Sequence, residues 1–280
     1  MSNTRNFLSI ANVLYLCMAF GLSPVFGGSI KQPVIYSYYW PIGKAQEDLL
    51  RWNMETPTVI DIPWQDIPKW REAKIYWEKR GRALLYRVYP FKGVKTEDEM
   101  YELFIKNLEK SKGIAIDEII TNKLSNEQAE MFINVLKRVR KAYPEKIVAV
   151  WCSGNWDMAN SLVLKTIRDY ADMFLPELYI SQKTAKESGL GKFKLYLKNA
   201  ETLAPGITKK TVVGLGMFPE MIDDPSQRFR DHLSAQIELL GTDPFFGSVL
   251  GIALCAPVYL QAEDQQWLDG ILKKYFSERK

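Results

Sequence analysis

Short apolar runs of strand length alternate with longer amphipathic stretches along the chain from Gln32 onward. A short apolar run bounded by turn-forming residues is typical of a strand that is buried on both faces of a parallel sheet. Each run is followed by a stretch with helical periodicity, so the pattern predicts eight pairs of β-strand and α-helix. The predicted strands are Pro33–Trp40, Thr58–Trp64, Arg82–Phe91, Lys112–Ile119, Lys146–Cys152, Asp172–Ile180, Thr211–Phe218 and Ser248–Leu260.

The amphipathic stretches predict the helices, and two of them begin with a recognisable cap. Thr96 is followed three residues later by Glu99, and Ser125 is followed in the same way by Gln128. Both pairs fit a capping box, in which two side chains satisfy backbone N–H groups at the start of a helix. The predicted helices are Lys44–Trp52, Ile67–Arg80, Thr96–Ser111, a segment from Ser125 to just before Pro144, Ser161–Tyr170, Lys192–Leu203, Pro225–Leu240 and Gln265–Phe276.

Eight strand and helix pairs over about 250 residues predict a single (β/α)₈ barrel, which we place at residues 28–280. A doubly wound open sheet shows a similar alternation, but it usually has a glycine-rich phosphate turn after its first strand. Here that position reads Trp40-Pro41-Ile42-Gly43. The barrel is therefore the favoured fold.

The composition is that of an ordinary globular protein, with 47% hydrophobic and 25% charged residues and a formal net charge of +4 in 280 residues. The Lys and Arg residues are scattered over predicted helical faces and form no basic stripe with interleaved aromatic residues. Nucleic acid is therefore not an expected partner. The sequence does not predict the oligomeric state.

The first 27 residues have the features of a secretory signal peptide. Arg5 precedes the uncharged apolar run Phe7–Leu22, and small residues follow near Gly27. We expect a secreted protein without a stable membrane partner after cleavage; an N-terminal membrane anchor is the alternative. Cys152 and Cys255 remain after cleavage, and because both lie in apolar runs, we expect buried free thiols.

Acidic residues stand at the ends of several predicted strands. The fourth strand, KGIAIDEI, ends in Asp117 and Glu118, and Glu177 lies in a similar place in the sixth. Asp61 lies within the second strand, and Glu220 follows the seventh. The carboxyl ends of barrel strands meet at one mouth, where the active sites of such barrels are built. We expect these acids to lie close together there.

Aromatic residues are expected at the same mouth, and with several carboxylates they indicate sugar chemistry. One carboxylic acid protonates the leaving oxygen of a glycoside while a second serves as nucleophile or as base for water. Aromatic rings offer flat apolar surfaces to sugar rings, and clustered acids raise the pKa of one another. The predicted substrate-binding residues are Tyr36, Tyr38, Trp40, Asp61, Trp64, Trp151, Tyr179, Glu220 and Tyr259.

Several of these acids also have a purely structural interpretation. Asp117 could pair with Arg87 of the neighbouring strand, and Asp61 could be a deeply buried hydrogen-bonding acid. Strict alternation directs Asp117 into the barrel together with Gly113 and Ala115, and Glu118 can join it only through a bulge or at the strand end. For Glu177, a structural salt bridge is an alternative to catalysis.

The tandem Asp117-Glu118 resembles the strand-four ends of barrel glycoside hydrolases. In the large clan with an Asn-Glu pair there, the resemblance implies that Glu118 is the proton donor and Asp117 its neighbour. GIAID also resembles strand four of family 18 chitinases, in which the decisive Glu lies two residues after the last Asp; this chain has Ile119 there. The resemblance thus extends to the architecture, and the chain matches neither motif fully.

We therefore predict a glycoside hydrolase with a carbohydrate substrate and no cofactor. Glu118 or Asp117 is the expected proton donor, and Glu177 the partner carboxylate. Two alternatives remain: a non-catalytic carbohydrate-binding barrel, and a lyase or isomerase that holds Mg²⁺ or Ca²⁺ with the same acids. The single histidine, His232, argues against a His-rich zinc site, and we expect it on a helical surface.

Overall fold

The computed structural model describes residues 33–38, 54–63, 68–155 and 158–276. The predicted signal peptide and the predicted helix Lys44–Trp52 lie outside these ranges. Within them, eight parallel strands form one sheet in the order β6-β5-β4-β3-β2-β1-β8-β7. The strands are β1 (Val34–Tyr38), β2 (Val59–Pro63), β3 (Ala83–Val88), β4 (Gly113–Ile120), β5 (Ile147–Ser153), β6 (Met173–Pro176), β7 (Val212–Gly216) and β8 (Gly251–Cys255).

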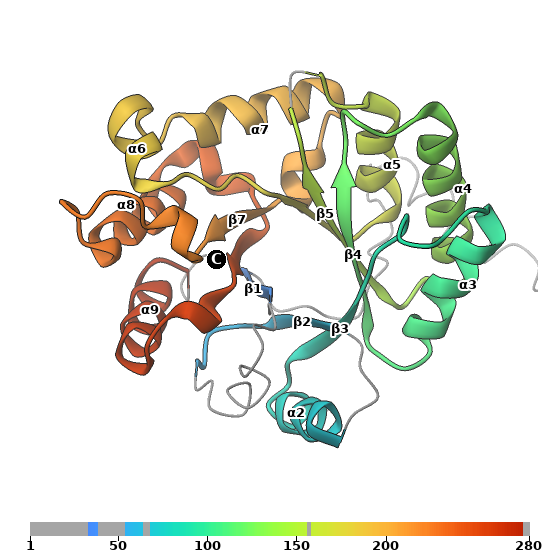
Figure 1. Ribbon diagram of the computed structural model, residues 1–280, viewed down its shortest axis with the longest axis horizontal. Coiled ribbons are helices and arrows are strands. Elements are labelled where there is room, and N and C mark those ends of the chain that lie inside the picture. Colours follow the sequence, from blue (N-terminus) through green and yellow to red (C-terminus); the bar gives the residue numbers. More distant parts are fainter. Residues whose placement is uncertain (1–32, 39–53, 64–67, 156–157, 277–280) are drawn as a thin grey trace, which may run out of the picture.

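Helices surround the strands, and the sheet is nearly closed into a barrel (Figure 1). An isolated parallel bridge between Phe174 and Thr211 joins the two ends of the sheet. The predicted (β/α)₈ architecture is thus confirmed for the described residues. The helices are α2 (Pro68–Lys79), α3 (Glu97–Leu108), α4 (Asn126–Ala142), α5 (Ser161–Tyr170), α6 (Gln182–Ser188), α7 (Lys192–Leu203), α8 (Phe229–Thr242) and α9 (Ala262–Phe276).

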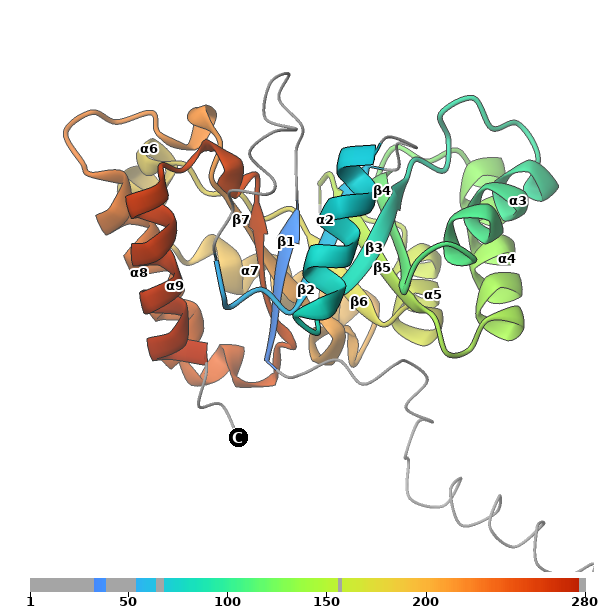
Figure 2. The same ribbon diagram turned by 90° about the horizontal axis from the view of Figure 1, so that it is seen from below.

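The strands all finish at one end of the barrel, which we call the mouth. The mouth faces the viewer in Figure 1 and points upward in Figure 2. Loops that follow the strands lie there, so a side chain at any strand end can reach the same surface.

Both predicted capping boxes are present. The Thr96 hydroxyl accepts a hydrogen bond from the Glu99 N–H, and the Glu99 carboxylate accepts one from the Thr96 N–H. Ser125 and Gln128 repeat the arrangement at the start of α4. These caps fix the first turns of α3 and α4, the two helices that flank β4 in sequence.

Alternation along the strands divides the core into two layers. Ile114 and Ile116 of β4 belong to the layer between sheet and helices, whereas Ala115 packs in the lumen of the barrel. Val34, Tyr36 and Tyr38 of β1 also face the lumen. The predicted pleat of the fourth strand is therefore correct up to Ile116.

The structure differs from the predicted elements after β6 and β8. The sixth strand ends at Pro176 rather than Ile180, and the eighth ends at Cys255 rather than Leu260. Proline cannot donate a hydrogen bond to a sheet, and Pro257 begins a 3₁₀ helix, Pro257–Tyr259. The short helix α6 was not predicted; it begins after Ser181, whose hydroxyl accepts from the Thr184 N–H.

The predicted surface position of His232 is wrong. Its ring is 2% exposed in α8, and Nε2 lies 2.9 Å from the Ile180 carbonyl oxygen and 2.8 Å from the Gln236 side-chain nitrogen. When Nε2 carries the ring proton it donates to the Ile180 carbonyl oxygen, and this hydrogen bond offsets the cost of burying a polar ring.

The predicted buried free thiols are confirmed, since Cys152 and Cys255 are both buried and neither is part of a disulfide. Burial is the main factor that raises the pKa of each thiol. None of the helices in the described residues has the length and hydrophobicity needed to cross a bilayer.

Candidate active site

A β-bulge at the end of β4 brings Asp117 and Glu118 to the mouth. The register between β4 and β5 shifts between Ile116 and Ile119, so the two acids fall within the irregularity. Glu118 has a φ of 63°, in the left-handed region that side chains rarely adopt. As a result Asp117 is buried on the lumen side while Glu118 is exposed, as the bulge hypothesis requires.

Asp117 is held by groups from three directions. Its Oδ2 accepts a 2.8 Å hydrogen bond from the Tyr38 hydroxyl and lies 3.9 Å from Nε of Arg87. Its Oδ1 accepts a 2.8 Å bond from the Glu118 N–H. The predicted pairing with Arg87 is therefore present, and it fixes the carboxylate beneath the mouth.

Asp61 lies deeper in the lumen as the buried hydrogen-bonding acid of the structural interpretation. Arg87 donates from Nη2 to its Oδ1, while the Tyr36 hydroxyl and the Trp151 indole N–H donate to Oδ2 at 2.9 and 3.1 Å. Tyr36, Asp61 and Trp151 are fully buried. In this conformation they support the site from below, and their contact with a substrate stays a prediction.

Glu177 reaches the site from the segment that directly follows β6. Its N–H donates to the Cys152 carbonyl oxygen at 2.9 Å, so the backbone still follows the edge of β5. Burial, with the nearby charges of Asp117 and Glu118, raises the pKa of the Glu177 carboxyl to about 7. Acids from β4 and from the end of β6 therefore act on each other, as the sequence predicted.

No salt bridge joins Glu177 to a basic side chain in the part of the chain that the structure describes. The structural alternative for Glu177 therefore has no partner among those residues. A carboxyl that is partly buried beside other acids, without a neutralising cation, is typical of functional sites.

The remaining predicted residues have different surroundings. Tyr179 packs edge-on against Phe218 with ring centroids 5.2 Å apart, and its hydroxyl is hydrogen-bonded to the Cys255 thiol. Tyr259 is 38% exposed after β8, and Glu220 is exposed in the 3₁₀ helix Pro219–Met221 after β7. Trp40 and Trp64 lie outside the described residues.

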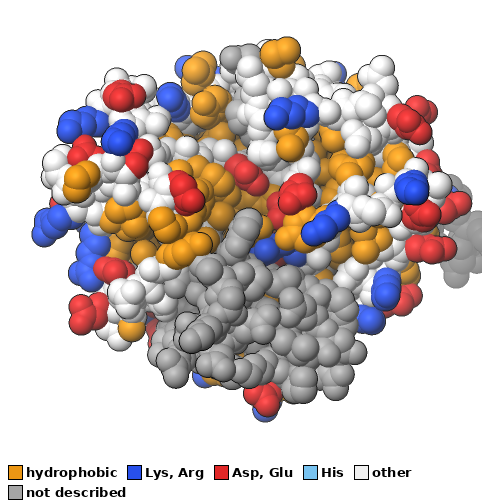
Figure 3. Space-filling view, viewed as in Figure 1, with side chains coloured by type: hydrophobic (Ala, Val, Ile, Leu, Met, Phe, Trp, Pro, Cys, Tyr) orange, Lys and Arg blue, Asp and Glu red, His pale blue; other side chains and the backbone are white. Residues whose placement is uncertain are grey.

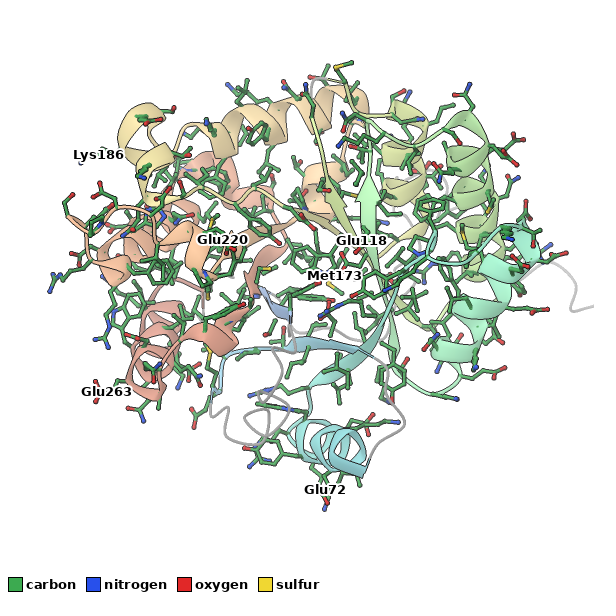
Figure 4. The ribbon with its side chains drawn as sticks, in the orientation of Figure 1. Glu72, Glu118, Met173, Lys186, Glu220 and Glu263 are labelled. Atoms are coloured by element: carbon green, nitrogen blue, oxygen red, sulfur yellow. The ribbon has the colours of Figure 1, made fainter. Side chains whose placement is uncertain are left out.

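The view onto the mouth shows acidic side chains around an apolar central surface (Figure 3). In Figure 4 Glu118 and Glu220 lie on either side of the barrel centre; Glu118 belongs to the last residues of β4, and Glu220 to the segment that follows β7. Two surface pockets of about 390 and 380 Å³ lie elsewhere, one beside α6 and α8 and one along α9. Neither is lined by the strand-end acids, so the chemistry and not the pocket volume identifies the site.

Arg87 is the site residue that the predicted set lacks. Its sequence signal is a charged residue inside the apolar run RALLYRVYPF, at the same parity as the lumen-facing Leu85. Among the described residues, no three His, Cys, Asp or Glu side chains form a ligand set for a metal ion.

No family model and no curated protein sequence matches the chain. Its fold is similar to that of a class V chitinase from Pseudomonas fluorescens Pf-5, with a TM-score of 0.63 at 11% identity over 86% of this chain and 100% of that one. It is also similar to a chitinase from Chromobacterium violaceum, with a TM-score of 0.60 at 12% identity over 84% and 97% of the two chains. A family 18 chitinase from Crocus vernus gives a TM-score of 0.59 at 12% identity over 86% and 99%. These similarities show that the chain has the barrel fold of these chitinases.

Proposed function

We propose that this barrel hydrolyses glycosidic bonds with Glu177 and Glu118 as its reacting carboxyl groups. The observation that carries the proposal is the pKa of Glu177, raised to about 7 by burial and by the acids of β4. A general acid works best when its pKa lies near the working pH. Glu177 is poised to hold a proton near neutrality and to release it to a leaving oxygen.

We propose the two roles in the reverse of the order expected from sequence. Glu177 is the partly buried member, which suits the proton donor. Glu118 is exposed on the bulge and suits a nucleophile or a base for water. Asp117, enclosed by Tyr38 and Arg87, supports both from below.

A carbohydrate substrate is supported by the fold and by the exposed aromatic ring at the mouth. The similar solved structures are of proteins named chitinases, so chitin oligosaccharides are the first substrates to test. Tyr259 presents a partly exposed ring after β8, where it can stack on a sugar.

The proposal is tested by a screen of aryl glycosides, chitin oligosaccharides and other polysaccharides with the wild type, Glu177→Gln and Glu118→Gln. Each variant is expected to lose about 10²–10⁴-fold in kcat, since each removes one carboxyl role. Glu263→Gln, on the far side of α9 in Figure 4, is the matched control and keeps wild-type activity. Equal release of reducing ends by all four proteins would remove both acids from the mechanism.

A non-catalytic carbohydrate-binding barrel is the second candidate, and Ile119 favours it. The decisive Glu of the chitinase-like motif would fall at this position, but Ile119 is fully buried in the layer between sheet and helices. Calorimetric binding of chitin oligosaccharides without any release of reducing ends would support this second candidate over hydrolysis.

A further inference from the structure

Three charged side chains lie buried in the lumen directly beneath the candidate site. Asp61, Arg87 and Asp117 come from the neighbouring strands β2, β3 and β4 and are 0%, 5% and 3% exposed. The lumen of a (β/α)₈ barrel is usually filled by branched aliphatic side chains. Buried charges are expensive, so an arrangement of this kind calls for a reason other than packing.

The contacts run from the interior of the lumen toward the mouth: Asp61 fixes Arg87, and Arg87 fixes Tyr38 and Asp117. Asp61 is bonded on both oxygens, by Arg87 on one side and by Tyr36 and Trp151 on the other. Its position is therefore set by three strands, and it anchors the guanidinium group.

Arg87 in turn contacts both Tyr38 and Asp117, which lie closer to the mouth. The guanidinium carbon lies 3.5 Å from the centroid of the Tyr38 ring, and Nε lies 3.9 Å from Asp117 Oδ2. The Tyr38 ring also packs edge-on against Trp151, with centroids 5.0 Å apart. Tyr38 is thus fixed by a cation on one side and an aromatic edge on the other, and its hydroxyl donates to Asp117.

We propose that Arg87, anchored by Asp61, is a positioning residue of the candidate site: through the Tyr38 ring and its own guanidinium group it fixes the carboxyl group of Asp117 beneath the mouth. Arg87 itself reaches neither solvent nor substrate. The contacts of Arg87 are present whatever the protein does. Only the expected effect of Arg87 on catalysis rests on the proposed function.

The consequence for the site passes from Asp117 to Glu177. The negative charge of Asp117 is one cause of the raised pKa of Glu177. When Asp117 loses its contacts to Arg87 and Tyr38, its carboxyl group is no longer held beside Glu177, and the charge effect that raises the Glu177 pKa weakens. The titratable and charged groups that act on these two acids are Tyr38, Asp61, Arg87, Glu118, Cys152, Tyr179 and Cys255.

The test replaces the pair without leaving an uncompensated charge, as Asp61→Asn/Arg87→Met. Glutamate labelled with ¹³C at the carboxyl carbon is titrated by NMR in the full chain, and Glu177→Gln assigns the Glu177 signal. We expect the midpoint of Glu177 to fall by about half a pH unit or more in the variant. An unchanged midpoint in a folded variant overturns the proposal.

The chain offers a matched control in a second buried pair. Arg140 and Asp172 are joined at the amino end of β6, away from the mouth. Asp172→Asn/Arg140→Met is expected to lower the melting temperature without moving the Glu177 midpoint. An equal shift in both double variants would show a general effect of destabilisation and would overturn the positioning role.

Tyr38→Phe decides the matter if the double variant does not fold. It keeps the ring under Arg87 and removes only the hydrogen bond to Asp117, so it is expected to lower the Glu177 midpoint by a smaller amount. No shift in folded Tyr38→Phe then overturns the proposal. On an aryl glycoside that the wild type cleaves, we further expect kcat to fall while KM stays constant.

The titration also separates this inference from the proposed function. A midpoint that moves in a protein without glycosidase activity leaves the positioning intact and removes the reaction. If the wild type hydrolyses glycosides but the Glu177 midpoint does not move in the variants, the proposed function stands and the positioning role of Arg87 is overturned.

Discussion

Glu118 occupies a backbone conformation that costs energy for a residue with a side chain. Its φ is 63°, and in the described part of the chain the only other non-glycine residue with a positive φ is Ala256, at 58°, which follows β8 at the same mouth. A left-handed conformation costs roughly 1–2 kcal/mol outside glycine. Strain at the mouth, in an exposed acid, is consistent with a role for the side chain itself.

Glu118→Gly is therefore expected to stabilise the protein while removing activity. Relief of the strain exceeds the added freedom of glycine in the unfolded chain, for a net gain of about 0.5–1 kcal/mol over Glu118→Ala in urea unfolding. Ala256→Gly is the control, with a similar gain and without loss of an acid. If Glu118→Gly were less stable than Glu118→Ala, the backbone conformation at position 118 would not be strained.

The raised pKa of Glu177 predicts a dependence of stability on pH. Between its ordinary value of 4.5 and about 7, the unfolded chain releases the proton that the folded chain retains, so stability falls as pH rises through this window. Glu177→Gln removes this loss. We expect the variant to be about 1–3 kcal/mol more stable than the wild type at pH 8 and nearly equal to it at pH 4, in urea titrations.

Activity is expected to fall on the alkaline side with the same group. As the proton donor, Glu177 must be protonated, so kcat/KM for an aryl glycoside declines above about pH 7. A constant kcat/KM from pH 6 to pH 9 would exclude Glu177 from this role.

Part of the site at the residue scale could be predicted from sequence. Alternation placed Asp117 in the lumen, and the adjacent acid implied a bulge, because two neighbouring side chains cannot share a face of a regular strand. The raised pKa of Glu177 could not be predicted, since it depends on the burial of that residue and on charges from another strand. Arg87 could be predicted as a partner of Asp117, but its stacking on Tyr38 depends on the spacing of three strands.

At the scale of elements, the sequence predicted correctly those features that depend on residues close together in the chain, such as the helix caps. The capping box at Ser125 involves residues three apart, so the sequence contains all of it. The helix α6 was missed because seven residues give too short a pattern to establish a period. The early end of β6 follows from Pro176, which the predicted strand included.

Ser125→Ala is expected to destabilise the protein by about 1 kcal/mol, because the Gln128 N–H loses its acceptor. Ser125→Asp, whose carboxylate can accept the same bond, is expected to keep most of the stability. Thermal unfolding of the two variants makes the comparison, and equal losses would show that the cap contributes little. Activity should be the same in both, since the cap lies beyond the loop that follows β4.

At the scale of the whole molecule, the barrel depends on the approach of β6 to β7. A side chain at Gly214 of β7 would bring its Cβ to 2.9 Å from the carbonyl oxygen of Pro176 in β6, closer than such atoms pack. The neighbouring residue in that segment is Glu177. Closure of the sheet and placement of the candidate acid therefore depend on the same contact.

Gly214→Ala is expected to lower stability by about 1–3 kcal/mol and to reduce activity more than its stability loss explains, because the backbone at Glu177 must move. Gly270→Ala in α9, where an added Cβ meets nothing, is the control and should gain up to about 1 kcal/mol from helix propensity. Urea unfolding and kcat measure the two effects. If Gly214→Ala kept wild-type stability and kcat, the backbone around Pro176 would be able to move away from the added Cβ without cost.

The number of strands and helices allowed the fold to be predicted at this scale, because only a few architectures use eight alternating pairs. The convergence of β4 and β6 at one mouth then follows from the topology. The narrow contact between β6 and β7 has no comparable signal, since a glycine in an apolar run is compatible with many neighbours.

The bulge in β4 also limits how this chain could acquire the acid of the chitinase-like motif. Ile119 faces the helix layer, so exchanging it for Glu would press a charge into hydrocarbon instead of presenting it to a sugar. A mutational path to that motif therefore requires two changes: deletion of Glu118, which would restore the pairing frame with β5, and exchange of Ile120, which would then lie two positions after Asp117, for Glu. A point substitution alone would not convert this barrel into one that carries the motif.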